Sequence, residues 1–154
     1  MVVSVRLAEF NMTRFIKSWR WFGPDDPVKL HWLKEIGVYE VVTALHHIPN
    51  GEIWPVEEIE KRQKMIESAG LKWTVVESLP VTEEIKTDSE QRERHIENYK
   101  VSLNNLAKSG IKTVVYNFMP VIDWIRTDLN FKLPNGGESM LFDFPTFAAF
   151  DMFI

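Results

Sequence analysis

The sequence predicts an α/β protein built around a parallel sheet, and a repeated pattern carries that prediction. A helical stretch ends at a glycine and a β-branched apolar run follows in three segments: KEIGVYEVVTAL (34–45), ESAGLKWTVVES (67–78) and AKSGIKTVVYNF (107–118). The spacing of these segments fits one helix and one strand per repeat. The runs are continuous rather than alternating, which is typical of parallel strands that helices cover. The pattern therefore favours alternating helices and parallel strands.

The predicted helices end where a residue with positive φ is needed, at Gly37, Gly70 and Gly110. The first helix is expected from about Pro27, and the second has Pro55 in its first turn. Apolar side chains recur at spacings of three and four along one face. The predicted inward-facing residues are Leu30, Leu33 and Ile36, then Val56, Ile59, Gln63, Ile66 and Ala69, then Ile96, Tyr99, Leu103 and Leu106. The opposite face of the second helix is predicted to be solvated: Glu57, Glu60, Lys61, Arg62 and Lys64.

Polar side chains follow the predicted strands at the points where the strands end. His46 and His47 follow the first apolar run, Glu77 ends the second, and Asn117 follows the third. A further strand is predicted within residues 15–22, ahead of the first helix. Because the carboxyl ends of parallel strands lie at one edge of a sheet, these polar side chains are expected to converge on one mouth.

Two parallel architectures remain open on pattern alone, a doubly wound sheet and a β/α barrel. No G-x-G-x-x-G motif follows the first strand and no Walker loop occurs, which disfavours a nucleotide-binding sheet. The barrel accounts better for a polar residue at every strand end, since barrel active sites lie on that face.

Composition excludes several classes of function. The 154 residues carry a net charge of -4 without a basic stripe, which argues against nucleic-acid binding. No apolar run is long enough to cross a membrane, and the N-terminus lacks the features of a signal peptide. The absence of cysteine excludes disulfides and thiolate chemistry within this chain. The cytoplasm is therefore the expected compartment.

The last part of the chain differs from the repeats. A Pro-Asn-Gly-Gly turn at 134–137 predicts a hairpin, placed as a flap at 125–144. A helix is expected to begin at Pro145. Only four strands are predicted, whereas a complete barrel has eight strands in roughly 250 residues. The sequence therefore predicts residues 13–154 as the N-terminal half of a barrel, with residues 1–12 as an extension.

Five stretches resemble the mannonate dehydratase family, in order and without large gaps from about Arg20 onward. They are RWFGPDDPV (20–28), VVTALHHIPNGEIWPVEEIEKR (41–62), GLKWTVVESLPV (70–81), IENYKVSLNNLAKSGIKTVVYNFMPVIDWIRTDL (96–129) and FDFPTFAAFD (142–151). The resemblance implies a (β/α)8 TIM barrel of the xylose isomerase-like type, of which this chain would supply the first four βα units and a hairpin insertion. It implies a lyase that dehydrates D-mannonate to 2-keto-3-deoxy-D-gluconate.

The resemblance also implies a divalent metal, Mn²⁺ or Fe²⁺, in the intact family enzyme. The family's ligands, a Cys with His and Asp residues, come from the second half of the barrel, whereas this chain has no Cys. We therefore expect no metal to be held by this chain alone, and we expect the chain alone to be inactive.

Candidate site residues come from the strand ends and from the segment before the hairpin. His46, His47 and Glu77 are candidate catalytic residues, and with Asn117 they are candidates to bind substrate hydroxyls. Because successive strand residues point to opposite sides, only one of the two histidines is expected to reach the substrate. Arg20 and Arg126 could each bind the substrate carboxylate through two hydrogen bonds. The Trp124 indole could stack on the sugar.

Two other functions compete with this one. The chain could belong to another metal-dependent barrel enzyme that acts on a different sugar acid. It could also be a non-catalytic half barrel that pairs with itself, because a half barrel exposes two sheet edges and an apolar face. A homodimer is the expected assembly.

Overall fold

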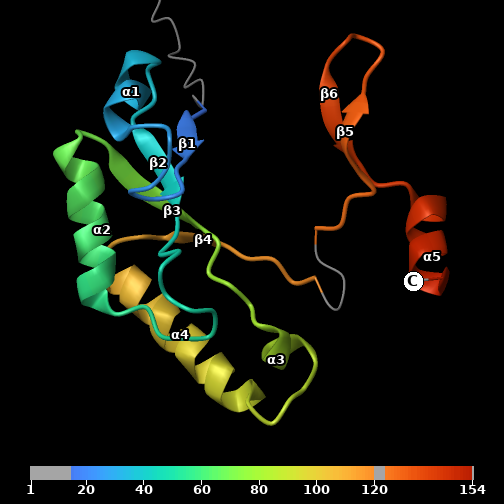
Figure 1. The fold of residues 1–154 in the computed structure, drawn as a ribbon. Helices are drawn as coiled ribbons and strands as arrows, with labels where there is room; N and C mark the ends of the chain where they lie inside the picture. The colour runs from blue at the N-terminus through green and yellow to red at the C-terminus, as the bar shows by residue number, and fades with distance from the viewer. Residues whose placement is uncertain (1–14, 120–123, 154) are drawn as a thin grey trace, which may run out of the picture. The chain divides into compact units, whose positions relative to one another are not determined.

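The computed structural model describes residues 15–119 and 124–153, in two compact units divided between Asn117 and Phe118. The first unit holds a four-stranded sheet with helices, and the second holds a two-stranded hairpin and one helix (Figure 1). The N-terminal extension predicted at residues 1–12 lies outside the described residues. The elements of the first unit are β1 (Ser18–Arg20), α1 (Leu30–Glu35), β2 (Glu40–Thr43), α2 (Val56–Ser68), β3 (Lys72–Glu77), α3 (Glu83–Lys86), α4 (Arg92–Lys108) and β4 (Thr113–Val115).

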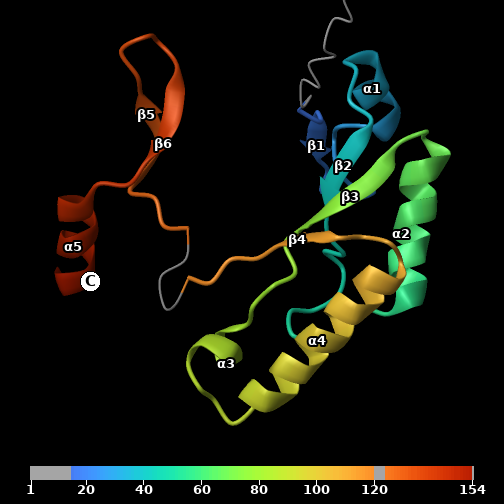
Figure 2. The ribbon, with the colours of Figure 1, turned by 180° about the vertical axis from the view of Figure 1, so that it is seen from behind.

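The strands of the first unit are parallel and lie in chain order, β1-β2-β3-β4. Trp19 pairs with Val41, and Val76 pairs with Val114. Parallel neighbours need a crossover between them, and α1, α2 and α4 occupy the three connections (Figures 1 and 2). The predicted alternation of helices and parallel strands is confirmed, and α3 is a short additional turn that the sequence pattern did not indicate.

The three repeats end their helices in the same way. Gly37, Gly70 and Gly110 adopt φ values of 72°, 74° and 81°. The residue after each glycine donates its backbone N–H to the carbonyl five positions earlier: Val38 to Leu33, Leu71 to Ile66, and Ile111 to Leu106. This bond closes the helix and turns the chain directly into the next strand. The predicted role of the three glycines is confirmed.

Helices cover one face of the sheet and form the core there. Val41 and Val76 of the sheet are fully buried, as are Ile59 and Ile66 of α2 and Leu106 of α4. Full burial of one such side chain contributes roughly 1.5–3 kcal/mol. The apolar face of α2 therefore packs onto the sheet as its spacing predicts. The strand side chains that meet it form the core side of the sheet.

The other face of the sheet is open. It carries Arg20, Val42, Val75, Glu77 and Val115, which the strand register places side by side. We call these five residues the open face. None of them is fully buried, and Val115 is 38% exposed. In a closed barrel this face would look into the interior.

Three predicted placements are wrong. Ile36 is 58% exposed, because α1 ends at Glu35 and Ile36 leaves the helical face. Leu103 is 36% exposed, because α4 turns Ser102 and Leu106 inward instead. Arg62, predicted to be solvated, is only 6% exposed, because its guanidinium folds back toward the sheet. The first helix also begins at Leu30 rather than at about Pro27.

The second unit contains β5 (Asp128–Lys132), β6 (Glu138–Leu141) and α5 (Phe144–Phe153). The strands pair antiparallel across the turn, where Gly137 donates its N–H to Asn135 Oδ1 at 3.0 Å. Asp143 accepts a hydrogen bond from the Thr146 N–H at 2.9 Å and so caps α5. No helix among the described residues is both long and apolar enough to cross a membrane.

Candidate functional site

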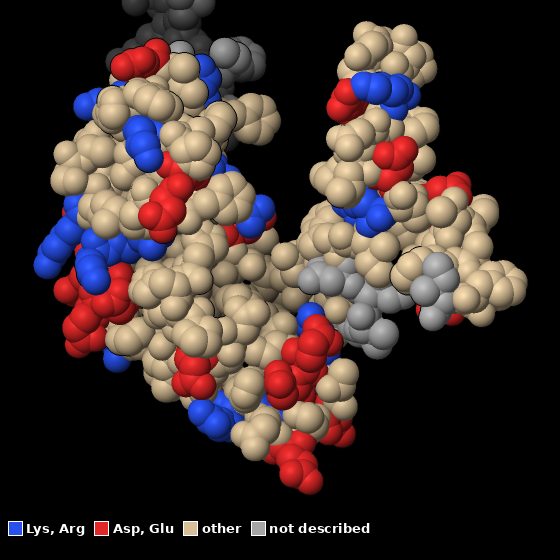
Figure 3. All heavy atoms as spheres, viewed as in Figure 1, with Lys and Arg blue, Asp and Glu red and all other residues tan. Residues whose placement is uncertain are grey.

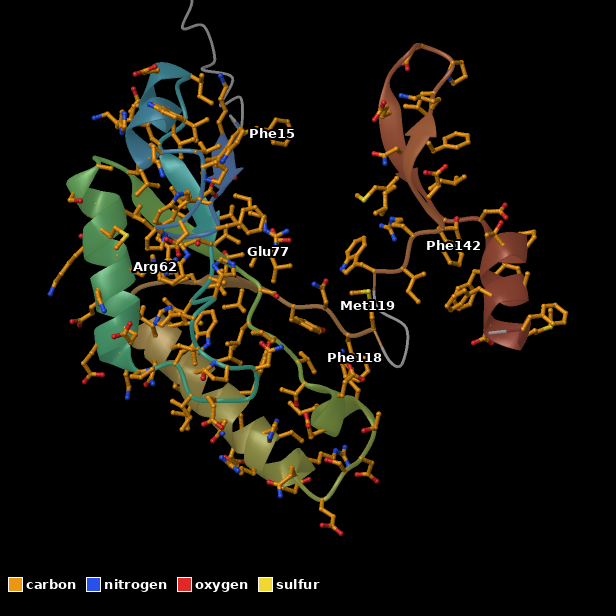
Figure 4. The ribbon with its side chains drawn as sticks, viewed as in Figure 1. Phe15, Arg62, Glu77, Phe118, Met119 and Phe142 are labelled. Carbon is orange, nitrogen blue, oxygen red and sulfur yellow. The ribbon has the colours of Figure 1, made fainter. Side chains whose placement is uncertain are left out.

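Arg20 and Glu77 meet on the open face of the sheet. Arg20 ends β1 and Glu77 ends β3, with β2 between them, and Arg20 Nη1 lies 3.4 Å from Glu77 Oε1. Their side chains are 48% and 33% exposed. The Arg20 guanidinium also lies over the Phe22 ring, 4.9 Å from its centroid. A carboxylate and a guanidinium thus lie together and accessible at the carboxyl ends of the strands. Figure 4 labels Glu77 at this end of the sheet.

The two histidines that follow β2 take different partners. The His46 ring lies 5.8 Å from the Phe22 ring, whereas His47 Nε2 lies 2.9 Å from Glu58 Oε2 at the start of α2. Partial burial lowers the pKa of His46, and the positive charges of Arg62 and Arg20 lower it further. The hydrogen bond from His47 lowers the pKa of Glu58. His46 is therefore a neutral imidazole near pH 7, and His47 is engaged with a helix.

A cavity of about 370 Å³ lies beside these histidines, between α2 and the two loops that follow β1 and β2. Arg62 lines it, with Nη1 donating to the Ala44 carbonyl at 3.0 Å and the guanidinium 5.3 Å from the Trp21 ring. The sequence pattern missed this arginine, because charge on the polar side of an amphipathic helix ordinarily points to water. Burial lowers the pKa of the Arg62 guanidinium.

The loop after β1 is fixed by the buried Asp26. Its carboxylate accepts the backbone N–H of Phe22 at 2.7 Å and that of Val28 at 2.8 Å. This short turn carries the chain from β1 to α1 and holds Phe22 beside His46.

Polar side chains of α4 hold the loop after β2. Asn98 Nδ2 donates to the Gly51 carbonyl at 2.8 Å, and Asn105 Nδ2 donates to the Trp54 carbonyl at 2.8 Å. Ser102 Oγ accepts the Trp54 N–H at 3.0 Å and is fully buried. The loop that bears His46 and His47 is therefore anchored to a helix more than 40 residues away in the sequence. These anchors carry no strand-end signature, and the sequence pattern did not identify them.

Three further predicted site residues, Asn117, Trp124 and Arg126, are described within the unit that holds each of them. Asn117 is exposed, two residues beyond β4, and its side chain makes no hydrogen bond to a described residue. Trp124 and Arg126 lie in the second unit, where the guanidinium sits 5.1 Å from the indole centroid. Their place at the strand-end site stays a prediction.

Among residues 15–119 and 124–153, no group of three or more His, Asp or Glu side chains is arranged to hold a metal ion. The strand-end arrangement can bind and orient an oxygen-rich substrate through an arginine, a carboxylate and neutral imidazole nitrogen.

Parallel strands in chain order, joined by helices and with polar side chains at their carboxyl ends, are the arrangement found in the β/α barrel class. The D-mannonate dehydratase (UxuA) family model matches residues 15–152. The chain therefore belongs to the mannonate dehydratase family.

Relatives and a solved structure agree with this assignment. Mannonate dehydratases of Chromohalobacter salexigens and Marinomonas sp. are each 54% identical to this chain over 137 residues, covering 89% of it. The crystal structure of mannonate dehydratase from Streptococcus suis serotype 2 is similar with a TM-score of 0.82 and 46% identity, over 88% of this chain and 39% of that one. The chain spans about 35% of the length of the two curated relatives.

Proposed function

We propose that this chain forms the first four βα units of a mannonate dehydratase barrel. The observation that carries the proposal is the Arg20–Glu77 pair on the open face, in a chain whose family match runs from residue 15 to residue 152. The reaction is the removal of water from D-mannonate to give 2-keto-3-deoxy-D-gluconate. Because the chain spans about 35% of its relatives, we expect the rest of the barrel to be required for turnover.

The reaction needs one group that binds the substrate carboxylate and one that accepts the proton removed from the neighbouring carbon. A base takes the proton from the carbon next to the carboxylate, the neighbouring hydroxyl leaves as water, and the resulting enol tautomerises to the keto acid. Arg20 suits the carboxylate because its fork of donors matches two oxygens. Glu77 lies beside it and is placed to bind a substrate hydroxyl or to act as the base.

His46 offers a second proton carrier near the same strand ends. Its lowered pKa keeps it neutral near pH 7, so that it can accept a proton there. His47 is already paired with Glu58 and serves to orient the loop. Asn117, Trp124 and Arg126 complete the proposed set as binding residues for the sugar.

The proposed cofactor is Mn²⁺ or Fe²⁺, bound by residues beyond this chain. The side chains described here form no such site, so no step of the reaction is assigned to a metal held by them.

The test is a fusion of this chain to the remaining residues of the Marinomonas relative, assayed with D-mannonate and Mn²⁺. We expect Arg20→Met to raise KM more than it lowers kcat, since it removes a contact made before and during the reaction. We expect Glu77→Gln to lower kcat by about 10²-fold or more if Glu77 moves the proton. Arg94→Met is the matched control, because Arg94 pairs with Glu52 on the surface at 3.3 Å. Unchanged kinetics in both variants would refute the assignment of the pair.

Self-association is a second candidate function, and the sheet itself favours it. β1 and β4 are edge strands, and Trp19 and Val115 on them are 37% and 38% exposed. Exposed edges and apolar faces promote pairing. We expect a homodimer in solution, and sedimentation equilibrium of the 154-residue chain tests it. A monomer at every concentration would count against pairing.

A further inference from the structure

We propose that the cavity between α2 and the loops after β1 and β2 binds a small oxyanion, a carboxylate or phosphate group, with Arg62 as its principal ligand. The cavity lies beside α2, and Arg20 and Glu77 lie on the open face, and Phe22 contacts both, because it lines the cavity and lies under the Arg20 guanidinium. The proposal does not depend on mannonate turnover, and its failure would leave the roles of Arg20 and Glu77 untouched.

Arg62 is a buried charge that makes no direct ion pair with a described residue, and the charge of Glu58 acts on it only from a distance. It is 6% exposed, and no carboxylate of the described residues lies within 4.0 Å of its guanidinium. The group has five N–H donors, and one hydrogen bond within the described chain, from Nη1 to the Ala44 carbonyl at 3.0 Å. The face of the Trp21 ring at 5.3 Å offsets part of the charge. The other N–H donors of Arg62 are not among the fully buried atoms without a partner, so they are accessible from the cavity and can meet an anionic ligand there.

The backbone is shaped to admit this guanidinium. Gly23 adopts a φ of 108°, and a Cβ atom there would lie 3.2 Å from Arg62 Nη1. The loop after β1 therefore passes directly beside the arginine, and Ala44 at the end of β2 holds it from the other side. The guanidinium is fixed in place before any ligand arrives, which reduces the entropy cost of binding.

The cavity has the size and lining that a small organic anion needs. Its volume of about 370 Å³ falls in the range of small-molecule sites. Phe22 and Met65 supply apolar wall for a carbon skeleton, and Lys61 adds a second cation at the mouth. Figure 3 shows basic side chains gathered over α2, next to a group of acidic ones.

The acidic side chains around the cavity do not cancel Arg62. Glu58 is already occupied by His47 at 2.9 Å and by Lys61 at 3.5 Å. Asp25, at the rim, is exposed to water, where its charge is screened. Glu58 therefore offsets part of the Arg62 charge without occupying its donors.

The experiment is an NMR titration of the 154-residue chain with sodium phosphate and, separately, with sodium acetate, each against sodium chloride of equal ionic strength. We expect saturable shifts at the Arg62 side-chain N–H and at the His46 ring, with chloride causing none. Tighter binding of phosphate would identify a phosphate ligand, and tighter binding of acetate would identify a carboxylate.

Two variants make the test specific. Arg62→Gln should weaken binding by about tenfold or more, because it removes a charge-assisted hydrogen bond. Lys64→Gln, a control two residues further along α2, should change it by less than about threefold, because Lys64 is exposed and is not among the residues that line the cavity. Equal binding by the Arg62→Gln chain, or no saturable shift in the unmodified chain, would overturn the proposal.

If Arg62→Gln does not fold, the location of the shifts in the unmodified chain tests the proposal. Shifts confined to residues around the cavity would support the site, and shifts spread over exposed lysines would overturn it.

Discussion

Arg20 and Glu77 form an ion pair that spans β2, with 3.4 Å between Arg20 Nη1 and Glu77 Oε1. The two residues end strands that are not neighbours, so the pair can form only where both side chains stand on the same face of the sheet. It marks the open face as the place where charged groups collect, opposite the face that the helices bury. A partly exposed pair of this kind contributes little to stability.

The Arg20–Glu77 pair should therefore contribute little to stability. In a double-mutant cycle with Arg20→Met and Glu77→Gln, the coupling free energy is expected to be below about 1 kcal/mol, since both side chains are well exposed. Urea unfolding of the four chains measures it. A coupling above about 2 kcal/mol would show a structural pair instead.

The glycine at position 51 should be far less replaceable than the glycine at position 37. Both have positive φ, 85° and 72°, so alanine is strained at either by about 1–2 kcal/mol. A Cβ at Gly51 would also lie 2.6 Å from the His95 ring, which Thr82 holds through a 2.9 Å hydrogen bond. At Gly37 the space is open. Gly51→Ala should cost at least about 1 kcal/mol more than Gly37→Ala in urea unfolding; equal costs would contradict the close contact.

The amides of α4 should stabilise the loop after β2. Asn105→Ala removes the donor to the Trp54 carbonyl and is expected to cost about 1 kcal/mol. Asn104→Ala, on the exposed side of the same helix turn, is expected to lie within about 0.5 kcal/mol of zero. Hydrogen exchange adds a local readout, because only the first change should speed exchange in the loop 46–55. Equal protection in both variants would argue against the anchor.

Replacing Arg62 should change the titration of His46. Burial first, and then the charges of Arg62 and Arg20, lower the pKa of His46 below its ordinary 6.5. Arg62→Gln removes one positive neighbour, so the pKa of His46 should rise toward 6.5, as the ring resonances in an NMR titration would show. Lys64→Gln, an exposed position of α2 outside the cavity lining, is the control and should leave the pKa of His46 unchanged.

The sign of the accompanying stability effect follows from the same shift. A histidine with a lowered pKa binds fewer protons in the folded state than in the unfolded state. The stability associated with neutral His46 is therefore present above pH 6.5 and is lost as the pH falls through its folded pKa. A His46 pKa above 6.5 in the unmodified chain would reverse this sign and contradict the environment described here.

The fold could be predicted because its signals are local. The glycines at 37, 70 and 110 mark helix ends by their own backbone needs, and the face of α2 follows from spacing alone. The four parallel strands and the two long helices, α2 and α4, lie where that pattern predicts, whereas α3 was not indicated and α1 begins at Leu30 rather than at about Pro27. Ile36 was misplaced because one residue decides whether a helix continues, and propensity does not fix a helix end to that accuracy.

The site could be predicted only in part, because side-chain partners depend on tertiary contacts. The ends of β2 and β3 identified His46, His47 and Glu77 as candidates, and Glu77 does meet Arg20. The buried position of Arg62 depends on the Ala44 carbonyl and the Trp21 ring, which only the folded chain brings near. No periodicity in α2 distinguishes that arginine from its solvated neighbours.

The most direct test of the central claim is dehydration of D-mannonate by the fusion of this chain to the remaining residues of a family relative, beside the 154-residue chain alone. With Mn²⁺ present, the fusion should form the 2-keto acid and the chain alone should form none. A folded fusion without turnover would contradict the assignment of this chain to a mannonate dehydratase barrel. Turnover by the chain alone would contradict the claim that the rest of the barrel is required.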